Sequence, residues 1–106
     1  MTNDKIKILK DLRIALTNRL NDNLVDVVLF GSQLTEDKTD SDYDILIIVN
    51  NKTDWRLERE ISDVCFDIDL KYGILTDTHI LSRDDLDTPR GRQPIFNNAI
   101  KQGFHA

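Results

Sequence analysis

Several features that would point to a specialised class of protein are scarce in this sequence of 106 residues. Cys65 is the only cysteine, so no disulfide can form within the chain, which is typical of proteins in a reducing compartment. No apolar run approaches the roughly 20 residues that cross a bilayer, and charges interrupt the N-terminus where a signal peptide would be apolar. We therefore expect a cytoplasmic protein without a membrane segment.

Basic residues are also few, since 14 Lys and Arg stand against 19 Asp and Glu and the net charge is -5. Long nucleic acid is bound mainly through clustered Lys and Arg, so it is not an expected partner. The sequence has no internal repeats, low-complexity stretches or linkers. Its length suits one hydrophobic core, which predicts a single domain over residues 1–106 with no room for a separate substrate domain.

Two long segments show the apolar spacing of amphipathic helices, at about residues 3–21 and about residues 54–72. A shorter helix of the same kind is expected from residue 95 to residue 103. Within the second segment, Asp67 and Asp69 alternate with apolar residues as they would on a strand. The longer window favours the helix, which makes both of them solvent-facing helix charges.

Three segments rich in β-branched and other apolar residues predict strands at about residues 25–30, 43–49 and 74–81. The run from Ile45 to Val49 does not alternate, which indicates a strand covered on both faces, by helices or by a second subunit. This run is the reason to consider a homodimer. Together the helices and strands predict an α/β (α+β) domain.

Chemistry-bearing residues gather around the first two strands. Gly31 and Ser32 form either an ordinary turn or, through their backbone N–H groups, a cradle for phosphate. Asp42 and Asp44 are either turn and strand-entry acids or a pair projecting from one face of a strand, as a Mg²⁺ site requires. Consecutive strands are usually neighbours, so the turn and the acid pair would meet, as nucleotidyl transfer needs.

This arrangement, Gly31-Ser32, nine further residues and then Asp42-Tyr43-Asp44 between apolar strands, resembles the signature of the polymerase-β-like nucleotidyltransferase superfamily. In length and layout the chain is most similar to the minimal nucleotidyltransferase (MNT) proteins, small bacterial domains often paired with HEPN proteins as toxin–antitoxin systems. The resemblance covers nearly the whole chain. It implies the polymerase-β-like fold, a small mixed three-stranded sheet with flanking helices.

The resemblance also implies an activity: Mg²⁺-dependent transfer of a nucleoside monophosphate, AMP from ATP, to a hydroxyl of a partner protein. Gly31 and Ser32 would bind the nucleotide, and Asp42, Asp44 and Asp77 would be the catalytic residues that bind two Mg²⁺ ions. The partner would be a HEPN-type toxin, which makes this chain the antitoxin. A second hypothesis is a catalytically weak module that neutralises its partner by binding alone, and a third is transfer to a small molecule.

Two features of the resemblance leave alternatives open. Asp77 matches the family's third carboxylate, but Asp67 and Asp69 would be the candidates if the second long helix were a strand. Gln33 and Glu36 stand where the family commonly carries Arg and Gly, which favours the binding-only hypothesis.

Two interpretations of His79 are open, because it shares a strand face with Asp77: contact with substrate or metal, and a structural role, which is favoured for a single histidine. His105 is near the end of the sequence and is expected to be frayed.

Overall fold

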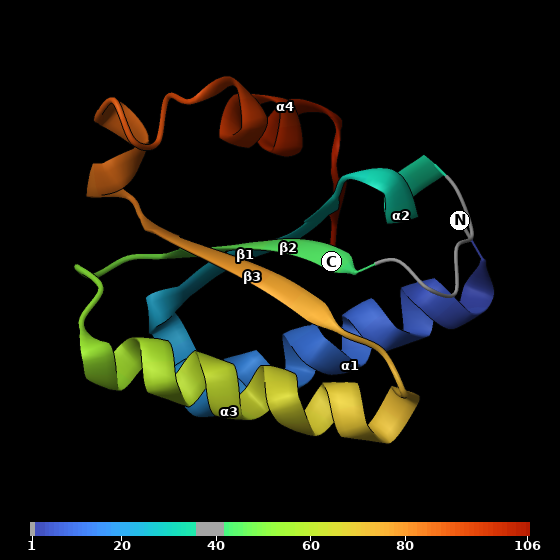
Figure 1. Cartoon of the computed structure of the whole chain (residues 1–106). Coiled ribbons are helices and arrows are strands. Elements are labelled where there is room, and N and C mark those ends of the chain that lie inside the picture. Colours follow the sequence, from blue (N-terminus) through green and yellow to red (C-terminus); the bar gives the residue numbers. More distant parts are fainter. Residues whose placement is uncertain (1, 36–41) are drawn as a thin grey trace.

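Four strands form one mixed sheet, with two long helices on one face and a short helix on the other (Figure 1). The structure is a computed structural model that describes residues 2–35 and 42–106. The strand order is β3-β2-β1-β4, with β2 and β3 parallel and the other two pairs antiparallel. The strands are β1 (Leu24–Phe30), β2 (Tyr43–Val49), β3 (Thr76–Ser82) and β4 (Phe104–His105).

Both long helices are confirmed to within one residue. The helices are α1 (Asn3–Leu20), α2 (Ser32–Thr35), α3 (Trp55–Tyr72) and α4 (Pro94–Gln102), with short 3-10 turns η1 (Asn21–Asn23) and η2 (Asp84–Asp87). The Thr2 hydroxyl caps α1 by accepting a hydrogen bond from the Lys5 N–H at 3.2 Å, and the Asp54 carboxylate caps α3 in the same way. Gly73 ends α3 in a left-handed conformation, with φ 65°.

The main core lies between the sheet and the pair α1 and α3, which cover the same face (Figure 1). The smaller α4 covers part of the opposite face through Phe96 and Ala99. Alternate residues of β2 enter the two cores, so the run from Ile45 to Val49 is covered on both faces by helices of its own chain. The observation behind the expected homodimer therefore has an explanation within one chain.

The fourth strand was not predicted, and the expectation that His105 is frayed is wrong. The backbone of β4 pairs with Val28 and Leu29 of β1. His105 is fixed from both sides, since its Nδ1 lies 2.5 Å from the Asp26 carboxylate and its Nε2 lies 2.8 Å from the Ile100 carbonyl oxygen. A strand of two residues carries no readable periodicity, which is why the sequence predicted only three strands.

Asp69 also differs from its prediction as a solvent-facing charge. It is half-buried, and its carboxylate accepts hydrogen bonds from the Thr76 N–H at 3.1 Å and the Thr76 hydroxyl at 3.3 Å. These bonds tie the end of α3 to the start of β3. Asp67 is exposed, as expected. Within residues 2–35 and 42–106, no helix is long and apolar enough to cross a membrane.

Candidate active site

The sheet register brings acids from two strands together on the face that α4 only partly covers. Asp44 of β2 lies beside Asp77 of β3 in the parallel pair and opposite Phe30 of β1 in the antiparallel pair. His79 follows Asp77 by two residues and therefore shares its face. Ligand atoms of Asp44, Asp77 and His79 all lie within 4.8 Å of one another.

The two acids of the predicted pair, Asp42 and Asp44, lie in different environments. Asp42 is exposed and comes immediately before β2, whereas Asp44 is half-buried inside the strand. Among the described residues, the metal-competent group consists of Asp44, Asp77 and His79, without Asp42. Asp42 is still close enough for its negative charge to act on Asp44, where it contributes to a raised pKa.

Burial is the main cause of the raised pKa of Asp44, and the negative charge of Asp77 adds to it. The nearby His79 imidazole acts in the opposite direction. An ionised Asp44 is therefore held in an unfavourable place, partly desolvated and next to a second carboxylate. A divalent cation between the two carboxylates would remove this repulsion.

The carboxylate oxygens of this cluster are suitable ligands for Mg²⁺. Mg²⁺ prefers oxygen ligands and usually takes one or two carboxylates from the protein, which Asp44 and Asp77 can supply. An imidazole suits softer metals better. His79 is thus better placed as a neighbour of Asp77, with its Nε2 at 3.7 Å from the Asp77 Oδ2.

The His79 ring is packed as a structural histidine would be, although its nitrogen faces the acids. Its centroid lies 5.8 Å from that of Phe30 and 5.7 Å from that of Phe96. The two aromatic rings fix the orientation of the imidazole beside Asp77. The sequence signal for this placement was the shared strand face, which by itself could not separate a packed histidine from one at the site.

Gly31 joins the predicted phosphate turn to the acids. Its φ is 79°, a left-handed conformation that favours glycine. A Cβ built on Gly31 would lie 2.2 Å from the Asp44 Oδ2, so only a glycine lets this carboxylate come so close to the turn. Ser32 follows as the exposed first residue of α2. The turn and Asp44 are therefore neighbours in space.

The turn is anchored from behind by a buried lysine. Lys5 of α1 is 5% exposed although its neighbours in the charged part of the helix face solvent, and its Nζ donates to the Gln33 carbonyl oxygen at 2.8 Å. Gln33, one of the two departures from the family pattern, is itself fully buried. Glu36, the other departure, lies outside the described residues.

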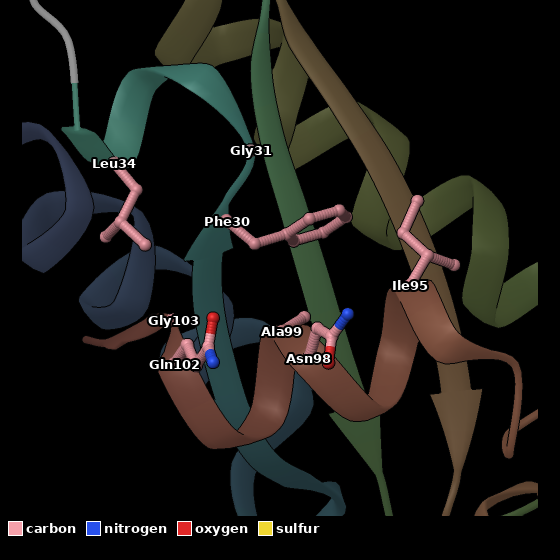
Figure 2. Close-up of a pocket in the computed structure, with 8 residues that line it drawn as sticks. All are labelled: Phe30, Gly31, Leu34, Ile95, Asn98, Ala99, Gln102 and Gly103. Atoms are coloured by element: carbon pink, nitrogen blue, oxygen red, sulfur yellow. The ribbon is translucent and has the colours of Figure 1, made fainter.

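A pocket of about 290 Å³ opens beside Gly31, between the end of β1, α2 and α4. Figure 2 shows α4 running along one side of it, with Leu34 at one end and Ile95 at the other. Asn98 and Gln102 are its amide side chains. No pattern in the sequence indicated this pocket, because its residues come from two segments far apart in the chain, 30–34 and 95–103.

The alternative acids lie elsewhere. Asp67 and Asp69 belong to α3, which covers the opposite face of the sheet, and Asp69 is engaged with Thr76. Cys65 of the same helix is buried, and burial raises the pKa of its thiol. Of the acids weighed for the third position, it is Asp77 that the structure brings to Asp44.

Comparison with known proteins gives an independent view of the chain. Residues 12–87 match the family model described as "Polymerase beta, Nucleotidyltransferase". The chain is 29% identical over 100 residues to a protein of Methanocaldococcus jannaschii named "Putative protein adenylyltransferase MJ0604", with 93% of this chain and 85% of the relative covered. No solved structure matches the chain. The match confirms the resemblance drawn from the two motifs.

Proposed function

Because this chain belongs to the polymerase β nucleotidyltransferase family, we propose that it transfers AMP from ATP to a hydroxyl group of a partner protein. The observation that carries the proposal is the cluster of Asp44, Asp77 and His79 directly beside the Gly31 turn. The name of the archaeal relative, a protein adenylyltransferase, supports the choice of nucleotide and acceptor.

The residues have distinct tasks in this reaction. Mg²⁺ ions, expected to be two, would neutralise charge on the triphosphate and on the departing pyrophosphate. Asp42, Asp44 and Asp77 would hold them, and the Ser32 hydroxyl and the backbone of Gly31 and Ser32 would donate hydrogen bonds to the β and γ phosphates. The acceptor oxygen forms a bond to the α-phosphorus while the bond from that phosphorus to pyrophosphate breaks.

The acceptor proton must also leave during the transfer. Asp77 is exposed at the edge of the cluster, so its carboxylate can reach an acceptor hydroxyl that Asp44, further inside, cannot. The His79 Nε2, 3.7 Å from the Asp77 Oδ2, lies where it can orient that carboxylate. We assign Asp77 to the acceptor side of the reaction for this reason.

The partner we propose is a HEPN-type toxin, with this chain acting as its antitoxin. The similarity of the chain to minimal nucleotidyltransferases, which are often paired with HEPN proteins, supports this choice. Modification of the toxin on a hydroxyl side chain would then neutralise it.

The test is to incubate the protein with Mg²⁺, ATP and the HEPN-type product of a neighbouring reading frame, and to look for added AMP by mass spectrometry. The Asp42→Asn, Asp44→Asn double variant should lose the modification, and Asp67→Asn, a matched change outside the cluster, should keep it. Modification that persists in the double variant contradicts the mechanism. A tight complex without modification favours the alternative in which the protein acts by binding alone.

A further inference from the structure

The pocket beside Gly31 has a composition that the transfer chemistry does not require. Three apolar side chains, Phe30, Leu34 and Ile95, form its walls, and two carboxamides, Asn98 and Gln102, lie one helical turn apart on α4. Its volume of about 290 Å³ is at the small end of ligand pockets, which suits one flat ring system better than a whole nucleotide.

The position of the pocket limits what can enter it. Gly31 lines the pocket and also lies against the Asp44 carboxylate, so the pocket and the acid cluster are adjacent. A molecule whose phosphates lie at Gly31 and the acids can therefore place its other end along α4 (Figure 2). The acceptor hydroxyl, in contrast, has to approach Asp77, which lies on β3 on the far side of β2 from Gly31.

We propose that this pocket binds the base of the nucleotide and that Asn98 and Gln102 read its edge as adenine. The proposal rests on the proposed function, since it takes the position of the phosphates from it. An amide side chain offers one donor group and one acceptor, which matches the donor and acceptor side by side on the edge of adenine. Guanine is read most often by Arg or Lys, and neither is found among the described residues that line the pocket.

The walls support the same assignment. The Phe30 ring and the aliphatic chains of Leu34 and Ile95 provide apolar surfaces for the faces of a base, while the two amides meet its polar edge. Asn98 and Gln102 are exposed, and Ile95 is 49% exposed, so these side chains are available to a ligand. A phenol ring would bring one polar atom to two amides and would match them less well.

The experiment compares ATP with inorganic tripolyphosphate, which carries the phosphates without a nucleoside. Binding of each to the full chain is measured by calorimetry in the presence of Mg²⁺, for the wild type and the Asn98→Ala, Gln102→Ala double variant. We expect the double variant to bind ATP about tenfold more weakly, because it loses two neutral hydrogen bonds, and to lose any preference for ATP over GTP. Its affinity for tripolyphosphate should remain within about twofold.

Asn97→Ala is the matched control, since it removes the same amide from the same helix outside the pocket. It should bind ATP as the wild type does, and melting curves of all variants should show intact folds. Equal affinity of wild type and double variant for ATP overturns the base assignment and leaves the proposed function standing. If the double variant binds ATP normally but has a raised KM for the protein acceptor, the base assignment is likewise wrong and the proposed function stands. A wild type that binds neither ATP nor tripolyphosphate overturns both.

Discussion

Asp42 and Asp44 share the spacing Asp-x-Asp with Asp67 and Asp69, yet only the first pair supplies a carboxylate to the candidate site. Asp42 and Asp44 enter an extended strand, where residues two apart point the same way, and Asp44 meets Asp77 on the next strand. Asp67 and Asp69 belong to α3, where two residues are separated by roughly 200° around the axis. Asp67 therefore faces solvent while Asp69 turns back to Thr76. The same spacing places a carboxylate at the candidate site or in a structural contact, depending on the backbone period.

The two left-handed glycines show the same contrast. Gly31 and Gly73 have φ values of 79° and 65°. A Cβ on Gly31 would collide with the Asp44 carboxylate, whereas a Cβ on Gly73 would have no atom within 4 Å. Both positions need glycine for the backbone, but only Gly31 also needs it for the approach of a side chain. The glycine at the candidate site therefore differs from the glycine of the scaffold in its neighbouring side chains, not in its backbone conformation.

The largest effect should come from substituting one member of each aspartate pair. We expect Asp44→Asn to lower kcat/KM for nucleotidyl transfer by at least about a hundredfold, because it removes a proposed metal ligand, and Asp67→Asn to leave it unchanged. Initial rates at fixed Mg²⁺ would measure both. Asp44→Asn should not lower the melting temperature, since burial and Asp77 raise the pKa of Asp44 and disfavour its ionised form. Equal losses in the two variants would remove the distinction between the pairs.

The glycine pair gives the next largest effect. Gly31→Ala should cost about 1–3 kcal/mol for the left-handed backbone, together with displacement of the Asp44 carboxylate. Gly73→Ala should cost about 1 kcal/mol, from the backbone alone. Thermal unfolding with and without Mg²⁺ separates the two contributions: Gly73→Ala should keep the stabilisation by Mg²⁺ that is expected of the wild type, and Gly31→Ala should lose it. A retained Mg²⁺ response in Gly31→Ala would contradict the placement of the metal.

The elements were largely predictable because their patterns are long and local. The spacing over 18 residues in α1 and in α3 identifies both helices, and a run of apolar residues identifies β2. The pairing of the strands, which creates the site, is not local. That Asp77 would lie beside Asp44 followed from a resemblance to a family, since no periodicity fixes the register between strands separated by a helix.

Three features lay beyond the sequence for physical reasons. Lys5 is a charged residue that is buried in the fold, where its Nζ donates to the Gln33 carbonyl oxygen and lies over the Tyr43 ring. The pocket along α4 depends on how three elements pack. The half-burial of Asp69 follows from the turn after α3, which returns Thr76 to it. Each of these features depends on tertiary contacts, which local sequence patterns do not predict.

Substitution of Asp69 should have a smaller effect, on stability alone, and tests the contrast between Asp67 and Asp69 in α3. Asp69→Ala removes the acceptor for the N–H and hydroxyl of Thr76 and should lower the free energy of unfolding by about 1 kcal/mol. The loss stays near this value because burial also raises the pKa of Asp69, so its ionised form is partly desolvated. Asp67→Ala should be neutral. In a domain of this size the difference corresponds to roughly 4–8 °C in melting temperature, with transfer activity retained in both variants.

The two histidines differ in the same way, and the smallest predicted effect is on the pH dependence of stability. Each lies beside an aspartate, but His105 sits in the scaffold, where its ring nitrogens face the Asp26 carboxylate and the Ile100 carbonyl oxygen. Both partners are acceptors, so both nitrogens must donate, which requires the charged imidazolium. The hydrogen bond to Asp26 accordingly raises the pKa of His105 above its usual value of 6.5.

A raised pKa means that the folded protein holds this proton more tightly than the unfolded chain does. The stabilisation is then complete below pH 6.5 and is lost as the pH rises through the folded-state pKa of His105. We expect a loss below about 1 kcal/mol, because the pair is partly exposed and screened by salt. Melting temperatures of wild type and His105→Ala from pH 5 to pH 9 should converge on the alkaline side. Curves that stay parallel over this range would show that His105 is held by contacts that do not depend on its charge.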